Sequence, residues 1–264
     1  MSILENQSLI RKRLHDNISK GKKSIATYLM LGYPDLQSSV NAMIELAKFD
    51  IDIIEIGFPF SDPIADGPII QNASNIALQQ GVTIENLWDA VRLITSETKA
   101  LPLVMTYGNI PYQYGFEKFC RYGVEAGVQG IILPDVPPKY YPQQLQELNP
   151  IFLASPLTNA TRLQELINKT KGFLYVVSHL GITGETAQLD DRLIQLIKKI
   201  KEIDNTLPKL LGFGISNKNS VRNALNLGFD GIIIGSALIK TLDVHDDFSK
   251  LHLLMEEITA ELQN

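Results

Sequence analysis

The feature that most constrains the fold is one unit repeated along the chain: a short apolar run, usually followed by a segment with helical spacing of its apolar residues. Several runs are continuously apolar, which is typical of parallel strands covered by helices. The predicted strands are Ser24–Leu31, Ile51–Ile56, Leu103–Tyr107, Gln129–Leu133, Ile151–Ala154, Phe173–Ser178, Lys209–Phe213 and Gly231–Gly235. The predicted helices are Leu36–Phe49, Ile84–Thr98, Phe116–Ala126, Tyr140–Leu148, Arg162–Lys169, Asp191–Ile203 and Lys218–Leu227.

Eight such units in 264 residues match the length of a (β/α)8 barrel. A doubly wound open sheet has a similar alternation, but no Gly-x-Gly-x-x-Gly turn follows the first strand. An N-terminal helix is expected before that strand, and the interval after the second strand has room for an extra helix over about Gly67–Gln79. No linker interrupts the chain. We therefore expect an α/β protein, a TIM barrel in one domain over residues 1–264.

Composition restricts the class of protein. The net charge is −5 with acids and bases interspersed, which gives no reason to expect nucleic acid or a membrane surface as partner. No apolar run reaches the roughly 18 residues that span a bilayer, and the charged N-terminus lacks the apolar segment of a secretory signal. Cys120 is the single cysteine, and the four histidines show no metal-ligand spacing. We expect a soluble protein of the cytoplasm or a plastid stroma, without a metal.

Two carboxylates flank the loop after the second predicted strand. Glu55 shares one face of that strand with Ile51 and Ile53, and in a barrel this face is the packed interior. Burial without a cationic partner raises a carboxyl pKa, so Glu55 could donate a proton near neutrality. Asp66 lies on the loop, where we expect more water and an ionised carboxylate that accepts a proton. Two structural alternatives stay open: a hydroxyl could bind Glu55 for stability alone, and Asp66 could cap the next helix.

Glycine turns follow the last two predicted strands. The segments are GFGIS at Gly212–Ser216 and GSALIK at Gly235–Lys240, and a third glycine loop, His179–Leu189, follows the sixth strand. Glycine lets an anion approach the backbone closely, and loops seven and eight form the recurrent phosphate site of such barrels. Because no basic side chain stands at either turn, we expect a phosphomonoester held by backbone N–H groups, a serine hydroxyl and the helix dipole. The alternative is that these glycines only form tight turns.

Three tyrosines, Tyr28, Tyr107 and Tyr175, stand at the ends of predicted strands. An apolar barrel mouth with a few polar tips suits an aromatic or apolar ligand body, although each tyrosine could equally pack in the core. Asp62 precedes Pro63 and is expected to form a turn or to contact another molecule.

Six sequence blocks, in chain order, carry a family resemblance: LGYPD (31–35), EIGFPFSDPIADGPIIQNAS (55–74), LPDVP (133–137), GITG (181–184), GFGIS (212–216) and GSALIK (235–240). With these blocks the chain resembles the tryptophan synthase alpha chain family over nearly its whole length. The resemblance implies a lyase of tryptophan biosynthesis that cleaves indole-3-glycerol phosphate to indole and glyceraldehyde 3-phosphate by a retro-aldol reaction, without a metal or organic cofactor. It also implies an alpha2beta2 heterotetramer, in which indole passes through a tunnel to a pyridoxal-phosphate beta chain.

The resemblance assigns roles to individual residues. Glu55 matches the catalytic glutamate that protonates C3 of the indole ring, and Asp66 matches the aspartate that binds the indole N–H. The residues implied to bind the substrate are Tyr28, Tyr107, Tyr175 and Thr183. Those implied to bind its phosphate are Gly184, Gly214, Gly235 and Ser236, and those implied to meet the beta chain are Phe58, Pro59 and Asp62.

The chain departs from the family pattern at three positions. His179 and Leu180 stand where an arginine and a small polar residue are common, and Met30 stands where a threonine is common. The first two bear on closure of the loop after the sixth strand and on activation by a beta chain. The alternatives to an alpha chain are a stand-alone lyase that releases free indole, a weakly active barrel that serves mainly to activate the beta chain, and, more remotely, another phosphate-binding barrel such as an isomerase.

Overall fold

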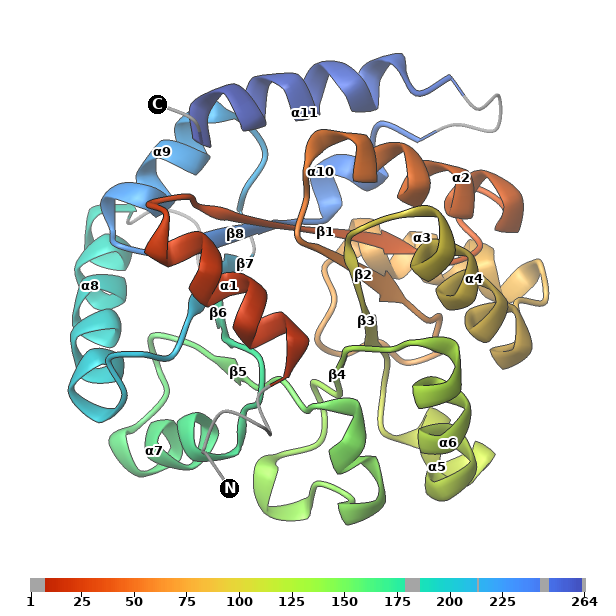
Figure 1. The fold of residues 1–264 in the computed structure, drawn as a ribbon, viewed down its shortest axis with the longest axis horizontal. Coiled ribbons are helices and arrows are strands. Elements are labelled where there is room, and N and C mark those ends of the chain that lie inside the picture. The colour runs from red at the N-terminus through yellow and green to blue at the C-terminus, as the bar shows by residue number, and fades with distance from the viewer. Residues whose placement is uncertain (1–7, 179–185, 213, 243–246, 263–264) are drawn as a thin grey trace.

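The computed structural model describes residues 8–178, 186–212, 214–242 and 247–262. Within these residues eight parallel strands form one sheet in the order β4-β3-β2-β1-β8-β7-β6-β5 (Figure 1). The strands are β1 Ser24–Met30, β2 Ile53–Gly57, β3 Leu101–Met105, β4 Gly130–Ile132, β5 Leu153–Ala154, β6 Leu174–Val177, β7 Lys209–Gly212 and β8 Gly231–Ile234.

The two edges of the sheet meet between β4 and β5. Ile131 and Pro150 form a parallel bridge, and the Ile151 N–H donates to the Ile131 carbonyl at 2.9 Å. The sheet thus curls into a barrel, and the predicted TIM barrel is confirmed. Closure gives the two ends of the barrel different roles, because the carboxyl ends of all eight strands lie at the same mouth.

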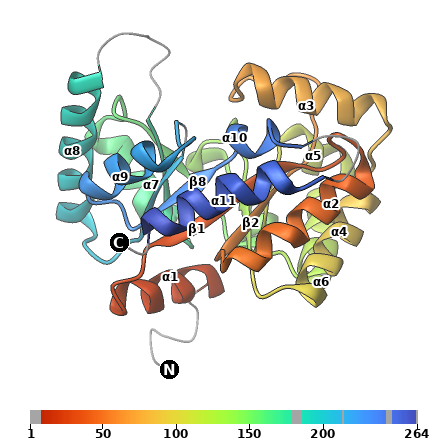
Figure 2. The ribbon, with the colours of Figure 1, turned by 90° about the horizontal axis from the view of Figure 1, so that it is seen from above.

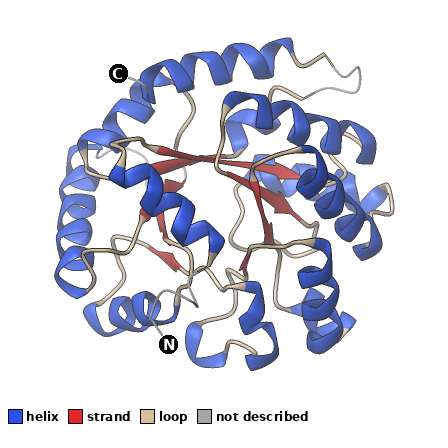
Figure 3. Ribbon diagram, in the orientation of Figure 1, coloured by secondary structure: helices blue, strands red, loops and turns tan. Residues whose placement is uncertain are grey.

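Most helices form a ring outside the strands, whereas the N-terminal helix crosses one end of the barrel (Figure 3). The helices are α1 Leu9–Ser19, α2 Leu36–Leu46, η2 Ala47–Phe49, α3 Pro68–Gln79, α4 Ile84–Glu97, α5 Asn109–Tyr114, α6 Phe116–Ala126, η3 Pro138–Tyr140, η4 Gln143–Leu148, α7 Ala160–Lys169, α8 Thr186–Ile203, α9 Lys218–Asn226, α10 Ser236–Ile239 and α11 Ser249–Leu262. Side chains cap several N-termini. Asp35 accepts from the Ser38 N–H, and Thr83 and Asn86 form a reciprocal capping box.

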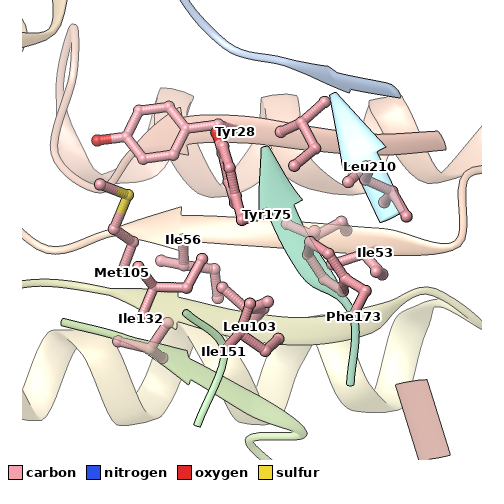
Figure 4. Packing of buried hydrophobic residues seen from close by; sticks show 14 of the residues in the cluster. Tyr28, Ile53, Ile56, Leu103, Met105, Ile132, Ile151, Phe173, Tyr175 and Leu210 are labelled. Carbon is pink, nitrogen blue, oxygen red and sulfur yellow. The ribbon is translucent and has the colours of Figure 1, made fainter. Parts of the chain in front are cut away.

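The apolar strands fill both faces of the barrel wall. Every residue of β1 and β2 is buried, because the inward face packs in the interior while the outward face packs against helices. Ile53, Leu103 and Leu210 of three strands, and Phe173 directly before β6, gather inside the barrel (Figure 4). The interior is therefore a packed core, and a ligand can enter only above it, at the mouth.

Helix α1 closes the other end of the barrel. Its Ile10 and Leu14 are buried, and Ile10 packs where any side chain at Gly130 or Gly172 would stand. In Figure 2, α1 lies on the side of the ribbon opposite to α3, which follows β2 at the mouth. The expected N-terminal helix is thus confirmed, and it forms the floor of the barrel.

A buried polar cluster fixes this floor to the strands. The Asp52 carboxylate is buried and accepts from the Asn17 side chain at 2.8 Å and from the Ile25 N–H at 3.1 Å. Asn17 also donates to Ser24 at 3.0 Å. Each polar group therefore has a partner that offsets its removal from water.

The extra helix expected over Gly67–Gln79 is confirmed as α3, with Gly67 at its N-cap. The predicted helix Tyr140–Leu148 is wrong as an α-helix. This segment consists of the 3-10 helices η3 and η4, because Pro142 lacks an N–H donor and Asn149 ends the segment with a left-handed φ of 52°.

Strand bounds also differ from the predictions, most clearly in β3, which begins at Leu101 rather than Leu103. Pro102 fits inside this strand although it lacks an N–H. The Pro102 carbonyl accepts a hydrogen bond from the Gln129 N–H, so the Pro102 nitrogen points toward the chain that leads into β4. Because β4 begins only at Gly130, the missing N–H removes no hydrogen bond between the two strands.

Candidate active site

A cavity of about 440 Å³ opens at the mouth of the barrel. Small-molecule sites in proteins commonly measure roughly 300–1,000 Å³. Residues from β1, β3, β6 and β8 and from the loops after β2, β7 and β8 line it: Tyr28, Asp66, Gly67, Pro68, Ile69, Ile70, Met105, Tyr175, Gly214, Ile215, Ile233, Gly235 and Ser236. Most of these side chains are apolar, and Asp66 is the one ionisable carboxylate among the described lining residues.

Glu55 lies on β2 below this cavity and is 1% exposed. Its Oε1 is buried and has no hydrogen-bond partner among the described residues. The alternative in which a neighbouring hydroxyl satisfies the carboxyl therefore fails for this oxygen. Burial, and secondarily the charge of Asp66, raises the pKa of Glu55 to about 8. The group is thus predominantly protonated near neutrality and able to donate, as the sequence predicts.

Tyr28 and Tyr175 lie close enough to Glu55 for their charges to interact, and Tyr28 is paired with Glu55 in the register of β1 and β2. Both line the cavity, and Figure 4 shows their rings side by side. A side chain at Gly57 would collide with the Tyr28 hydroxyl, and one at Gly212 would collide with the Tyr175 ring. The two glycines therefore make room for the two tyrosines. Burial raises the pKa of both phenols, so both remain neutral donors.

Asp66 reaches the cavity from the loop after β2. Its Oδ2 accepts from the Tyr107 hydroxyl at 3.1 Å, while its Oδ1 is buried without a partner among the described residues. Burial raises the pKa of Asp66 to about 6, and the bond from Tyr107 acts in the opposite direction. Asp66 is half-buried, so it lies in more water than the buried Glu55, as expected, although in less water than a fully exposed loop carboxylate. The carboxylate is nevertheless ionised at neutral pH.

The alternative that Asp66 caps a helix is also wrong. The N-cap of α3 is Gly67, and no side chain accepts a bond from its first turn. Asp66 contributes its backbone carbonyl instead, which accepts from the Gln71 side chain at 2.9 Å. Its carboxylate is therefore left for the cavity side of the loop.

The predicted phosphate residues gather at another part of the cavity. Gly214, Gly235 and Ser236 line it together with Ile215. Gly214 has a φ of 83°, a left-handed conformation that favours glycine. Thr183, Gly184, His179 and Leu180 lie outside the described residues, so the predictions made for them stay predictions.

The predicted partner residues differ in exposure. Phe58 and Pro59 are buried, whereas Asp62 is exposed. The large exposed apolar residue among the described positions of this loop is Ile64, which the sequence interpretation did not single out. Any partner that docks on the loop would meet Asp62 and Ile64 first.

Sequence reasoning missed the apolar lining and the two glycines that admit the tyrosines. Met105, Ile215 and Ile233 carry no chemical signal that separates them from core residues. Gly57 does carry one, because it lies two positions after Glu55 on the same inward face. A glycine there indicates that another side chain occupies the space above Glu55.

The described residues contain no group of three or more His, Cys, Asp or Glu side chains arranged to hold a metal ion. They also contain no helix long and apolar enough to cross a bilayer.

Known proteins have similar sequences and the same fold. The family model for the tryptophan synthase alpha chain matches residues 14–263. This chain belongs to the tryptophan synthase alpha chain family. The alpha chain of Petrotoga mobilis is 37% identical over 93% of this chain and 97% of its own length, and that of Dehalococcoides mccartyi is 36% identical over 95% and 99%.

Solved structures agree with this membership. A tryptophan synthase structure from Mycobacterium tuberculosis superposes with a TM-score of 0.88 at 31% identity, covering 98% of this chain and all of that one. The tryptophan synthase subunit alpha of Legionella pneumophila gives 0.83 at 30% identity, covering 98% and 99%. The prediction of an alpha chain, and of an enzyme of tryptophan biosynthesis, is confirmed at this level.

Proposed function

We propose that this alpha chain is a lyase that cleaves indole-3-glycerol phosphate to indole and glyceraldehyde 3-phosphate. The observation that carries the proposal is the pairing of a fully buried, proton-holding Glu55 with an ionised Asp66 that lines the cavity, each with one oxygen that has no partner among the described residues. Unpartnered buried carboxylate oxygens are unfavourable in a folded protein. Their presence in a pair supports a ligand that supplies the missing donors.

The proposed reaction needs one proton given and one taken back. Glu55 donates its proton to C3 of the indole ring, which leaves a positive charge shared with N1. Asp66 accepts a hydrogen bond from N1–H and stabilises that charge. The Glu55 carboxylate then takes the proton of the hydroxyl on the carbon attached to C3. The C3–C bond breaks, its electron pair restores the indole, and the hydroxyl carbon becomes the aldehyde.

The cavity supports this substrate in two respects. Its apolar lining, which includes Met105, Ile215 and Ile233, suits a flat indole ring. Gly214, Gly235 and Ser236 offer backbone N–H groups and a hydroxyl for the phosphate, with no lysine or arginine among the described lining residues. Binding energy from the phosphate would serve to orient the glycerol arm at the carboxylates. We propose no metal and no organic cofactor on this chain.

We further propose that the mouth of the barrel docks on a pyridoxal-phosphate beta chain in an alpha2beta2 complex. Four strongly exposed apolar side chains lie on the segments that follow β2, β3, β4 and β5: Ile64, Tyr112, Tyr140 and Leu157. Exposed apolar residues on neighbouring loops favour a protein partner. This position would put the partner next to the cavity that releases indole. A location in the cytoplasm or a plastid stroma stays a prediction.

The test is cleavage of indole-3-glycerol phosphate by wild type and by Glu55→Gln, each with and without a cognate beta chain. We expect wild type to be slow alone and faster with the beta chain, and the variant to bind substrate but to lose nearly all turnover. Glu97→Gln, at an exposed position on α4, is the matched control. Wild-type turnover in Glu55→Gln would refute the role of Glu55.

The same assay decides between the alternatives. Full activity of the isolated wild-type chain would support a stand-alone lyase. Absence of cleavage even with the beta chain present would support a barrel that serves only to activate its partner.

A further inference from the structure

The hydroxyl of Tyr107 makes two hydrogen bonds, and both end on the loop after β2. It donates to Oδ2 of Asp66 at 3.1 Å and accepts from the backbone N–H of Ala65 at 3.0 Å. One hydroxyl thus fixes an oxygen of the carboxylate and also the backbone immediately before it. Tyr107 is buried and is not among the described residues that line the cavity. The sequence interpretation assigned it to substrate binding, whereas its contacts are with Asp66.

The ring of Tyr107 and the backbone that follows it are both held in place. It stacks on Phe60, with ring centroids 4.9 Å apart and an angle of 21° between the planes. Phe60 is held by Ser74 on α3, whose hydroxyl accepts from the Phe60 N–H and donates to the Phe60 carbonyl. The backbone directly after Tyr107 is held as well, because the Gly108 N–H donates to the Asp135 carboxylate at 2.9 Å. The hydroxyl therefore projects from a rigid support.

This arrangement divides the two oxygens of Asp66 between two tasks. Oδ2 is occupied by Tyr107, while Oδ1 is left without a partner among the described residues. Without the bond from Tyr107, the Asp66 carboxylate could rotate about its two side-chain bonds. A catalytic group that is held in its working orientation reacts faster than one that must be oriented in each turnover.

We propose that Tyr107 is a positioning residue for Asp66, and that its hydroxyl holds Oδ2 so that Oδ1 remains the free acceptor for the indole N–H. This inference rests on the proposed function. Tyr107 has no contact with the substrate in this arrangement and acts through Asp66.

The ionisable groups around Asp66 determine how a loss of this bond appears in a titration. Glu55 faces it from β2, Tyr28 from β1, Tyr175 from β6 and Tyr107 from the segment after β3. At neutral pH the three phenols are neutral and Glu55 is mostly protonated, so the Tyr107 bond is the main interaction that opposes burial. Removing that bond raises the pKa of Asp66 above about 6.

The test is Tyr107→Phe, which keeps the ring and its stacking and removes only the hydroxyl. With the beta chain present we expect kcat for indole-3-glycerol phosphate to fall about 10–100-fold, the range for a hydrogen bond to a charged group, while KM changes little. The acid limb of the kcat/KM profile should move to higher pH. Tyr122→Phe makes the same chemical change on helix α6, outside both the cavity lining and the proposed interface, and it should leave both quantities unchanged.

Two further measurements keep the inference separate from the proposed function. The carboxyl carbon of Asp66, followed by 13C NMR in the folded chain, should titrate at higher pH in Tyr107→Phe than in wild type, and this readout does not need turnover. In an Asp66→Asn background, Tyr107→Phe should have little further effect on kcat, because the group that it positions is already gone. An unchanged Asp66 titration, or equal effects of Tyr107→Phe in both backgrounds, would overturn the inference. Absence of cleavage in wild type would refute the proposed function instead.

Discussion

At the scale of single residues, two carboxyl groups of one active-site mouth differ because their surroundings differ. Glu55 is buried in the barrel wall, and burial, with a smaller contribution from the charge of Asp66, raises its pKa to about 8. Asp66 is also removed from water but receives a hydrogen bond from Tyr107, and its pKa is about 6. Between these values one group is protonated and the other is ionised, which is the state that the proposed reaction requires.

The first prediction concerns the pH dependence of catalysis. Activity requires ionised Asp66, so kcat/KM should fall as the pH drops through about 6; it requires protonated Glu55, so kcat/KM should also fall as the pH rises through about 8. The measurement is kcat/KM for indole-3-glycerol phosphate between about pH 5 and about pH 9, a range that extends about one unit beyond each of the two pKa values.

Asp66→Asn provides the control for this profile. It should lower turnover by about 10²–10⁴-fold, the usual contribution of an acid–base group. It should also remove the acid limb and shift the alkaline limb to lower pH, because the charge of Asp66 contributes to the raised pKa of Glu55. A bell-shaped profile identical to that of wild type would contradict the assignment of both limbs.

The second prediction is that Glu55 destabilises the fold at alkaline pH. Its pKa is raised from 4.5 in the unfolded chain to about 8 in the folded one, so the folded state binds the proton more tightly. The free energy of unfolding therefore falls as the pH rises from about 4.5 to about 8. Because one pKa unit corresponds to about 1.4 kcal/mol, the total is a few kcal/mol.

Urea unfolding of wild type and Glu55→Gln checks this prediction. The amide has no such proton, so the variant should gain stability relative to wild type from pH 5 to pH 8, and the difference should level off above pH 8. A constant difference at all pH values would show that the carboxyl does not titrate in the folded state as its burial requires.

At the scale of the secondary structure elements, local patterns and tertiary position contribute differently. Apolar periodicity located the strands and most helices, and α3 was predicted from chain length alone. The one predicted helix that failed, Tyr140–Leu148, contains Pro142 and ends at Asn149, and these backbone effects outweigh its helical spacing. The first and last residues of a strand such as β3 depend on where the neighbouring strands begin and end. A local sequence pattern does not contain that information.

The third prediction concerns α1 as the floor of the barrel. Ile10→Ala should destabilise the chain by about 2–5 kcal/mol, because it removes a fully buried side chain and leaves a cavity between Gly130 and Gly172. The change in urea midpoint measures this. Leu9→Ala is the matched control, since Leu9 is 53% exposed on the same helix and its loss should change stability little. Equal effects of the two substitutions would show that α1 does not seal the barrel.

At the scale of the whole molecule, the barrel separates stability from chemistry. Its floor carries α1 and the buried Asn17–Asp52 cluster, whereas the mouth carries the cavity, the two carboxyl groups and the exposed apolar side chains of four loop segments. Parallel strands produce this division, because every loop that leaves a carboxyl end opens on the same side.

The fourth prediction concerns the proposed beta chain. Leu157 is 71% exposed on the segment after β5. Leu157→Asp should leave cleavage by the isolated chain unchanged but should weaken its activation by the beta chain about 10-fold or more, as expected for a charge buried in an apolar interface. A titration of cleavage rate against beta-chain concentration measures this. Leu253→Asp is the control, because Leu253 is 66% exposed on α11 and away from the mouth loops. A larger effect at Leu253 would place the interface elsewhere.

The sequence by itself determined the barrel, the family and the identity of the two carboxyl residues. Strand and helix periodicity are local properties, and the long block from Glu55 to Ser74 is specific enough to identify the family. The tertiary structure alone decided how those residues are held. It brought Tyr28 and Tyr175 close to Glu55, left Asp66 out of the helix cap, and joined Asp66 to Tyr107, which lies 41 positions away in the chain. The physical reason is that burial and hydrogen bonding to a side chain depend on distant segments that meet only when the sheet closes.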